Sequence, residues 1–473
     1  MKKKSTIKSI IQVTLSNITT ILSGILVGFL LPKMISVDDY GYYKTFTLYA
    51  SYAGLFSIGM IDGIVLAFGG KNYEHLNKEY FRSYFKWYFL IHCIFVVALF
   101  SGGMFFLDSE YGLIITFLGV YLLANNITGY FQQLSQITQR FKEYSVRKIL
   151  QSTLNVLAVV SLFVMYKFHI DINYRMYLSI WLVINIILTL WYVFTYRDII
   201  FGQSCSMKET RNDMSGFIKN GIPLLIANLC SSLILTLDRQ FVNVLFDKTT
   251  YAVYAFAYNM LALVTVATSA VSSVLYPTMK RMDENDLKKN YGLLIGVILL
   301  FVNAALIVYF PLSLFVKAYL PKYTDSLVIF QIIFPGLTIS SAITVVMHNY
   351  YKVFEASFKY FKKSIVVLIV SFAANLASYA IWKTTISISI ASIATMVVWY
   401  IYVENYFVKE YQYKRWKNLG YILAMLGVFY LISAIRNEWI GACIYLVVYL
   451  AFSFVFYKKD IKILSKLFNK SKK

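Results

Sequence analysis

Long apolar runs recur along the whole chain, with short polar segments between them. A helix of about 20 apolar residues is long enough to cross the hydrocarbon core of a bilayer, which is roughly 30 Å thick. The pattern predicts an all-α polytopic membrane protein with about fourteen transmembrane helices. The runs cover approximately residues 9–32, 43–69, 83–107, 111–137, 147–168, 174–196, 215–246, 250–277, 290–318, 324–350, 357–382, 385–406, 416–434 and 437–457.

Within the run over residues 215–246, the stretch from Gly221 to Phe246 contains two charged residues, Asp238 and Arg239, about two turns before its end. On a period of 3.6 residues, its leucines take one stripe and its polar residues another, which includes Asn228, Ser231 and Ser232. A charged side chain at bilayer depth costs on the order of 3 kcal/mol, so it usually faces a bundle interior or an aqueous cavity. The stripe predicts that this helix lines a polar pathway. The alternative is an Asp/Arg pair near the outer interface that neutralises itself.

A second polar stripe occupies the run over residues 111–137, where Asn125 and Gln132 share one face and Arg140 follows the helix. We interpret this stripe as the lining of a hydrophilic vestibule. Lys86 and Lys219 lie near the predicted cytoplasmic ends of their helices and, with Arg140 and Arg239, are candidate cations for a substrate cavity. The alternative for the three cations near the cytoplasmic ends is the positive charge that such ends carry in general.

The second apolar run contains one carboxylate, Asp62, within the segment SIGMIDGIVLAFGG. A carboxylate at this depth either carries a proton or a cation, or accepts a hydrogen bond that holds helices together. We take Asp62 as the candidate residue for ion coupling, with H+ or Na+ as the coupling ion. The sequence leaves both interpretations open.

The chain contains a weak internal repeat with an offset of about 211 residues. The segment VDDYGYY follows the first run and FDKTTYAVY follows the seventh, which aligns Tyr40 with Tyr251 and Tyr43 with Tyr254. We therefore expect two six-helix bundles related as parallel repeats, with the substrate site in the cleft between them. The expected division is an N-terminal bundle (1–200), a cytoplasmic linker (201–214), a C-terminal bundle (215–410), an appended transmembrane hairpin (411–457) and a basic cytoplasmic tail (458–473).

The composition agrees with a membrane protein, because 59% of the residues are hydrophobic and 14% are charged. A net charge of +22 would suit nucleic-acid binding, but Lys and Arg occur in short clusters between apolar runs, so we expect no nucleic-acid partner. If the basic N-terminus is cytoplasmic, most of the 45 Lys and Arg fall on the cytoplasmic side. Both termini are therefore expected in the cytoplasm.

Several kinds of site are missing from the sequence. The four cysteines have neither metal-ligand nor redox spacing, and we interpret them as free thiols. There is no phosphate-binding glycine loop and no HExxH motif, and no extramembrane loop exceeds about 20 residues. We expect no catalytic residue, no metal and no cofactor, and no ATP hydrolysis within this chain.

Several short motifs resemble those of a known family. They are DDYGYY after the first run, Gly59 and Gly63 in the second run, and GIP followed by the Asp of LDRQF in the seventh run. That family is the polysaccharide (O-antigen and capsule repeat-unit) flippase family of the multidrug/oligosaccharidyl-lipid/polysaccharide exporter superfamily. The resemblance spans residues 1–410. It implies a multi-pass protein of the bacterial cytoplasmic (inner) membrane that moves an undecaprenyl-pyrophosphate-linked oligosaccharide repeat unit across by alternating access. The implied partners are the lipid-linked oligosaccharide and polysaccharide assembly proteins.

Three alternative functions remain. The predicted helices also resemble those of lipid II flippases, which carry arginines on their first and eighth helices, whereas runs 9–32 and 250–277 contain no Lys or Arg. A multidrug or organic-cation exporter of the same fold would favour an acidic, aromatic cavity. A membrane glycan polymerase or ligase would be expected to have a large outer loop, and none is predicted here.

Overall fold

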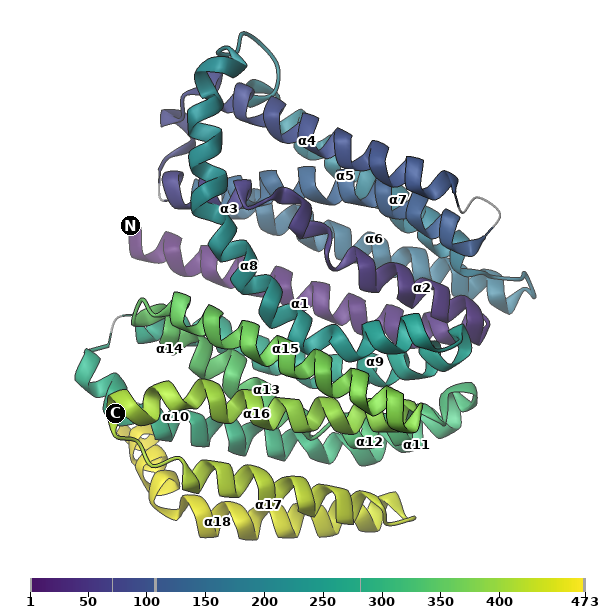
Figure 1. The fold of residues 1–473 in the computed structure, drawn as a ribbon, viewed down its shortest axis with the longest axis vertical. Helices are drawn as coiled ribbons and strands as arrows, with labels where there is room; N and C mark the ends of the chain where they lie inside the picture. The colour runs from purple at the N-terminus through teal and green to yellow at the C-terminus, as the bar shows by residue number, and fades with distance from the viewer. Residues whose placement is uncertain (1, 70, 106–108, 281, 471–473) are drawn as a thin grey trace. The chain divides into compact units, whose positions relative to one another are not determined.

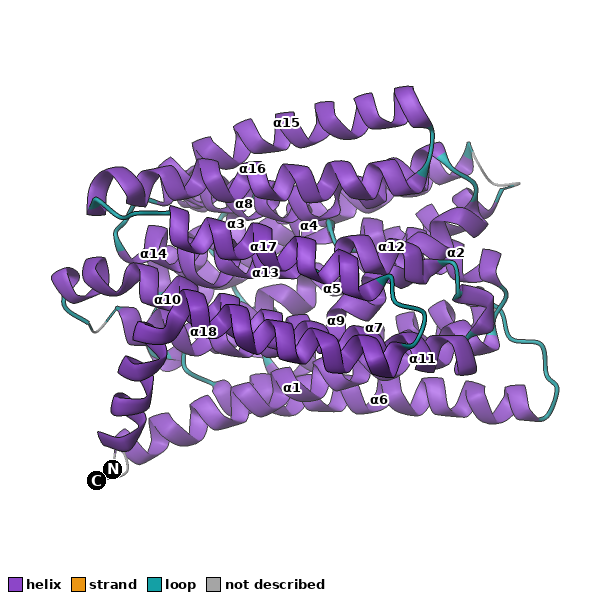
Figure 2. Cartoon of the chain, turned by 90° about the horizontal axis from the view of Figure 1, so that it is seen from below, coloured by secondary structure: helices purple, strands orange, loops and turns teal. Residues whose placement is uncertain are grey.

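The computed structural model describes residues 2–69, 71–105, 109–280 and 282–470, and all regular structure in them is helical (Figures 1 and 2). The longer helices are α1 (Lys2–Met34), α2 (Val37–Ala50), α4 (Lys78–Met104), α5 (Glu110–Ile137), α6 (Phe141–Lys167), α7 (Tyr174–Thr195), α8 (Met207–Leu245), α9 (Lys248–Met279), α10 (Glu284–Ala305), α11 (Tyr309–Tyr319), α15 (Ser357–Trp382), α16 (Thr385–Tyr411), α17 (Trp416–Ser433) and α18 (Glu438–Lys470). The shorter helices are α3 (Met60–Phe68), α12 (Ser326–Ile333), α13 (Gly336–Ser341) and α14 (His348–Val353), with single turns η1 (Ala53–Ser57), η2 (Tyr73–His75), η3 (Arg197–Ile199), η4 (Leu306–Val308), η5 (Pro321–Tyr323) and the π-helical η6 (Ala342–Met347).

Each of the apolar runs in the sequence coincides with helix, so the all-α membrane fold is confirmed. In the described part of the chain, eleven helical segments are long and apolar enough to cross a membrane. The number is thirteen if each of two bent helix pairs is one span. The helix at the eighth predicted run, α9, is not among these thirteen, so the structure supports eleven to thirteen candidate spans.

The chain divides into two compact units. Unit 1 comprises Met1–Leu229 and Asp247–Ala252, and unit 2 comprises Cys230–Phe246 and Val253–Lys473. Helix α8 therefore contributes to both units. Its first residue, Met207, lies within the segment predicted as a linker. The predicted division into two bundles, a linker, a hairpin and a tail stays a prediction.

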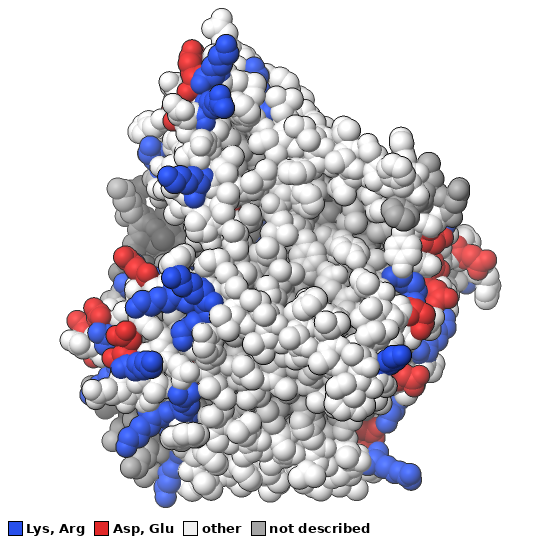
Figure 3. All heavy atoms as spheres, in the orientation of Figure 1, with Lys and Arg blue, Asp and Glu red and all other residues white. Residues whose placement is uncertain are grey.

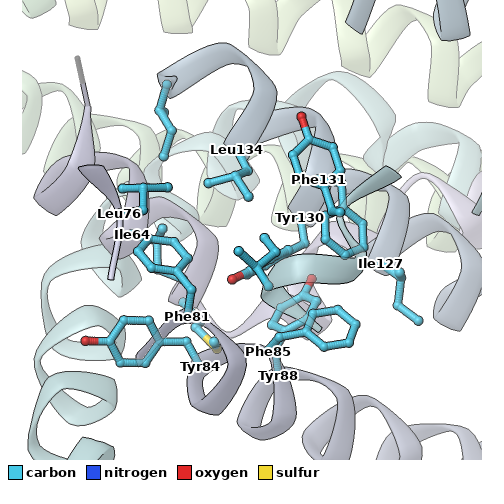
Figure 4. Close-up of a cluster of buried hydrophobic side chains, with 14 of the residues drawn as sticks. Ile64, Leu76, Phe81, Tyr84, Phe85, Tyr88, Ile127, Tyr130, Phe131 and Leu134 are labelled. Carbon is cyan, nitrogen blue, oxygen red and sulfur yellow. The ribbon is translucent and has the colours of Figure 1, made fainter. Parts of the chain in front are cut away.

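In unit 1, α1 lies along α6, and α5 packs against α4, α7, α2 and α3 (Figure 1). Aromatic and aliphatic side chains from α3, α4 and α5 meet in one core cluster (Figure 4). Phe81, Tyr88 and Phe131 are almost fully buried there. Because lipid is as apolar as these side chains, tight packing contributes more to holding such helices together than removal of apolar surface from water does.

Small polar residues cap many of the helices. Each side-chain oxygen accepts a hydrogen bond from a backbone N–H of the first turn, which has no partner within the helix. Such caps are Ser36 on α2, Asn77 on α4, Ser109 on α5, Asn173 on α7, Asp283 on α10 and Thr384 on α16. The caps satisfy these donors where the chain turns between apolar helices.

The second span of unit 1 is broken between η1 and α3, with a bend of 54°. Ile58 and Gly59 both have positive φ at the break, 51° and 73°. The side-chain amide of Asn126 on α5 donates a hydrogen bond to the Ala53 carbonyl at 2.9 Å. Irregular backbone at membrane depth needs such partners, because no water satisfies its carbonyls there.

Directly after this break, α3 and α8 touch through glycine. A Cβ atom added at Gly221 would lie 1.8 Å from the Gly59 carbonyl oxygen, and one added at Gly63 would lie 2.1 Å from the Phe217 carbonyl oxygen. No side chain fits at these positions without separating the two backbones. The crossing holds the first half of α8 close to α3 within unit 1.

In unit 2, α16 packs against α15, α12 and α13, and α10 packs against α13. The span that contains α12 and α13 bends by 43° at Pro335 and Gly336. Proline removes a backbone donor and its ring clashes with the preceding turn, which explains the bend. On the face shown in Figure 3, charged side chains lie toward the helix ends in both units.

Helices α17 and α18 form an antiparallel pair that packs on α10, α11 and α12 (Figure 2). Tyr445 and Tyr449 donate hydrogen bonds to the carbonyls of Asn303 at 2.8 Å and Leu300 at 3.0 Å. The other face is apolar and exposed, as Leu431, Val447 and Val455 show. The helical geometry of α18 is interrupted at Tyr457, where the predicted basic tail begins.

Candidate functional site

Asp238 lies on the part of α8 that belongs to unit 2, and its side chain is buried. Its Oδ2 atom accepts hydrogen bonds from two tyrosines of α9: from Tyr254, at 2.7 Å, and from Tyr258. Its Oδ1 atom accepts a hydrogen bond from the backbone N–H of Arg239 at 2.8 Å. The carboxylate is therefore held by hydroxyl and amide donors, as a buried polar group requires.

The side chain of Arg239 turns to other partners. Its guanidinium lies 4.5 Å from the centre of the Tyr258 ring, and Nη2 donates a hydrogen bond to the Leu235 carbonyl at 2.9 Å. Its Nε atom is buried without a hydrogen-bond partner in the described part of the chain. None of the ion pairs among the described residues includes Arg239. The described contacts thus do not pair the Arg239 guanidinium with the Asp238 carboxylate.

The other predicted polar residues of α8 precede this pair. Ser231 donates a hydrogen bond to the Tyr360 hydroxyl of α15 at 3.3 Å, and the Tyr360 ring stacks on His348 at 4.7 Å. The Ser232 carbonyl accepts a hydrogen bond from Thr236 at 3.0 Å. Asn228 belongs to unit 1.

The predicted vestibule stripe on α5 lies in unit 1. Asn125 and Gln132 are both partly exposed, and Asn125 accepts a hydrogen bond from Tyr121 at 3.0 Å. Their neighbour Asn126 is buried and supports the broken span. The sequence pattern did not separate the two adjacent asparagines.

The remaining candidate cations have varied surroundings. Arg140 forms an ion pair with Glu143 and lies over the rings of Tyr73 and Tyr196, at 4.4 and 4.9 Å. Lys86 is exposed and donates a hydrogen bond to Ser204 at 2.6 Å. Lys219 is exposed on α8. Arg140 and Lys86 thus join segments of unit 1, and a role in a substrate cavity stays a prediction for all three.

Asp62 lies in the first turn of α3, three residues after the left-handed Gly59. The N-terminus of a helix favours a negative charge, whereas partial burial of the side chain disfavours it. The side chain is partly buried. Ion coupling by Asp62 stays a prediction.

Tyr258 is a site residue that was not predicted from the sequence, and Tyr254 was predicted only as part of the repeat. Their spacing of four residues places both on one face of α9. This spacing is the available sequence signal, but it points to a site only once the partner on α8 is known. No group of three or more His, Cys, Asp or Glu suited to a metal ion occurs in the part of the chain that the structure describes.

A family model described as "Polysaccharide biosynthesis protein" matches residues 6–283. No curated protein matches the chain in sequence. Several solved structures resemble its fold. A lipid II flippase MurJ in an inward closed conformation has a TM-score of 0.71 and 16% identity, over 96% of this chain and 100% of that chain.

The MATE multidrug transporter DinF-BH has a TM-score of 0.56 and 13% identity, over 87% of this chain and 97% of that chain. A MOP superfamily transporter from Pyrococcus furiosus has a TM-score of 0.55 and 12% identity, over 86% of this chain and 97% of that chain. At these identities the likeness concerns the fold alone. Because the family model covers more than half of the sequence, the chain belongs to the polysaccharide biosynthesis protein family.

Proposed function

We propose that this protein is a flippase that moves an undecaprenyl-pyrophosphate-linked oligosaccharide repeat unit from the cytoplasmic to the outer leaflet of a bacterial inner membrane. The two units would alternate access to the substrate, without ATP hydrolysis in this chain, and deliver it to polysaccharide assembly proteins. The family and the likeness to a lipid II flippase support a lipid-linked glycan as the substrate class.

The observation that carries the proposal is the pair of environments at Asp238 and Arg239. The carboxylate is satisfied by two tyrosine hydroxyls, whereas the described contacts give the guanidinium no carboxylate partner. A pyrophosphate is recognised by guanidinium groups through strong charge-assisted hydrogen bonds. An organic-cation exporter would need the opposite arrangement, with an accessible carboxylate. We therefore favour an anionic lipid substrate.

Transport in proteoliposomes tests this proposal. The purified protein should transfer an undecaprenyl-pyrophosphate-linked oligosaccharide between leaflets, measured by its accessibility to an enzyme added outside. We expect Arg239→Gln to lower the initial rate by about 10- to 150-fold, because one charge-assisted hydrogen bond contributes about 1.5–3 kcal/mol. Arg239→Lys should retain more activity. The control is Arg436→Gln, at a loop position between α17 and α18, which should transport normally.

A deletion strain tests the same proposal in cells. It should accumulate the lipid-linked repeat unit in the inner leaflet and lose surface polysaccharide. Normal surface polysaccharide, in a strain without a second flippase gene, would contradict the proposal. Transport of lipid II in preference to the oligosaccharide lipid would identify the lipid II flippase as the correct alternative.

A further inference from the structure

Glu404 is a fully buried carboxyl group on α16, about two turns before the end of that helix. Its Oε1 atom accepts a hydrogen bond from the Tyr400 hydroxyl at 2.8 Å. Its Oε2 atom is buried and has no hydrogen-bond partner in the described part of the chain. None of the ion pairs among the described residues includes Glu404. One half of this carboxyl group is therefore unsatisfied.

Aromatic side chains surround Glu404. The Tyr351 hydroxyl of α14 donates a hydrogen bond to the adjacent Val403 carbonyl at 2.8 Å. Tyr291 of α10 stacks on Phe407 at 4.5 Å, and its hydroxyl is also buried without a partner in the described structure. Besides Tyr400, the tyrosines that face the site lie on α10, on α14 and in the segment after α16: Tyr291, Tyr351 and Tyr413.

Two titratable groups on the neighbouring elements form hydrogen bonds with partners other than Glu404. On α15, Lys363 donates a hydrogen bond to the Tyr402 carbonyl at 2.5 Å. On α18, the Tyr457 hydroxyl donates to Asn418 at 2.7 Å. The segments α12, α13 and η6 contain no titratable residue.

Arg415 is the cation near Glu404, and it lies in the segment between α16 and α17. Its guanidinium donates hydrogen bonds to the Asn405 side chain and, at 3.4 Å, to the Ile401 carbonyl. Both acceptors lie on α16, within one turn of Glu404. A change in the α16–α17 connection would move this cation relative to the carboxyl group.

An ionised carboxylate that is buried with one hydrogen bond and no ion pair is strongly disfavoured, whereas a protonated carboxyl group is tolerated at much lower cost. We propose that Glu404 is a proton-binding site of unit 2. The carboxyl group holds a proton in the conformation described here. When movement of the α16–α17 connection brings water and Arg415 to Oε2, the proton passes to water and Arg415 stabilises the remaining carboxylate. On the proposed flippase function, this proton exchange accompanies substrate transfer.

Infrared spectroscopy of the full-length protein in nanodiscs tests the proton site directly. In D2O at neutral pH, the wild-type protein should show a carbonyl band of a protonated carboxylic acid that is missing from Glu404→Gln. The control Glu410→Gln, at an exposed position on the same helix, should retain the band. Identical spectra for the wild-type protein and Glu404→Gln would overturn the proposal. Comparison of the wild-type spectrum with that of Tyr400→Phe gives a second readout. Loss of the hydrogen bond from Tyr400 should shift the frequency of the carbonyl band.

Transport of the oligosaccharide lipid in proteoliposomes tests the coupling. The wild-type rate should change with an imposed pH gradient, and Glu404→Gln should lose that dependence while Glu410→Gln keeps it. A pH-dependent rate in Glu404→Gln equal to that of the wild-type protein would refute the coupling. If the wild-type protein fails to move the oligosaccharide lipid, the proposed function fails, and the infrared result still decides whether Glu404 binds a proton.

Discussion

The side-chain hydroxyl of Thr249 donates a hydrogen bond to Asp38, and the two residues are 211 positions apart. This separation equals the offset of the repeat predicted from the sequence, and both residues belong to unit 1. Lys248 adds a hydrogen bond to Thr45 at 3.2 Å. The repeat itself stays a prediction.

We predict that Gly41→Ala weakens this contact. A Cβ atom at Gly41 would lie 2.4 Å from the Lys248 carbonyl oxygen, so the start of α9 must shift away from α2. The expected loss is about 1–3 kcal/mol of stability, typical of overpacking, and thermal unfolding in detergent would measure it. Gly54→Ala is the control, since its Cβ atom would meet nothing within 4 Å. An equal change in both variants would contradict the prediction.

The tyrosine hydroxyls that hold Asp238 give a second prediction. Tyr258→Phe removes one hydrogen-bond donor and keeps the ring beside Arg239, so stability should fall by about 1 kcal/mol. Combined with Tyr254→Phe, the loss should exceed the sum of the two single losses, because the carboxylate then loses both side-chain donors. Thermal unfolding of the four proteins measures this coupling. Tyr402→Phe, at an exposed tyrosine, should leave the unfolding temperature unchanged. Additive losses would count against a shared site.

Topology can be checked with reporter fusions. The predicted orientation places Lys383, between α15 and α16, outside the cell, and it places Asn285 and Lys414 inside. A reporter active only outside should therefore work at Lys383 and fail at the other two positions. The opposite result at any one of them would invert the orientation of its neighbouring helices.

The pH dependence of stability should reflect Asp198 of η3, which lies outside the spans. Partial burial raises the pKa of this carboxyl group, but the hydrogen bonds from Lys78 at 2.6 Å and Tyr73 at 2.7 Å lower it more, and the pKa lies below its usual value. The stabilisation is therefore present above the unfolded-state pKa of about 3.9 and is lost as the pH falls through the folded-state pKa.

Asp198→Asn should accordingly lower stability near neutral pH by about 1 kcal/mol, a modest value because both partners are partly exposed. It should also make acid unfolding less steep. Unfolding temperatures measured from neutral to acid pH check both expectations. Asp171→Asn, at an exposed position, serves as the control and should show neither effect.

The ion dependence of transport tests the role of Asp62. If Asp62 couples transport to an ion, Asp62→Asn should lose the dependence of the transport rate on pH or on sodium, and protein abundance in the membrane should stay normal. If Asp62 only accepts a hydrogen bond in the bent span, the variant should lose abundance and keep the ion dependence per molecule. Transport assays normalised to protein amount separate the two roles.

The helices were predictable because a bilayer demands long apolar segments, and each run in the sequence coincides with helix. The hydrogen-bond partners of Asp238 were not predictable from the sequence, because the face of α9 that meets α8 depends on how the two helices pack. Glu404 was overlooked for a related reason. It lies close to the end of a run, where charges normally reach water, and its burial arises from α10, α14 and the chain after α16.

The hydrogen bonds that fix the α17–α18 pair have an evolutionary consequence. Tyr445 and Tyr449 donate to backbone carbonyls of α10, which every amino acid supplies. Substitutions along α10 that keep the size of the side chain leave these carbonyl acceptors in place. Attachment of the α17–α18 pair therefore depends mainly on the tyrosines of α18. The pair can therefore stay attached while the sequence of the bundle beneath it diverges.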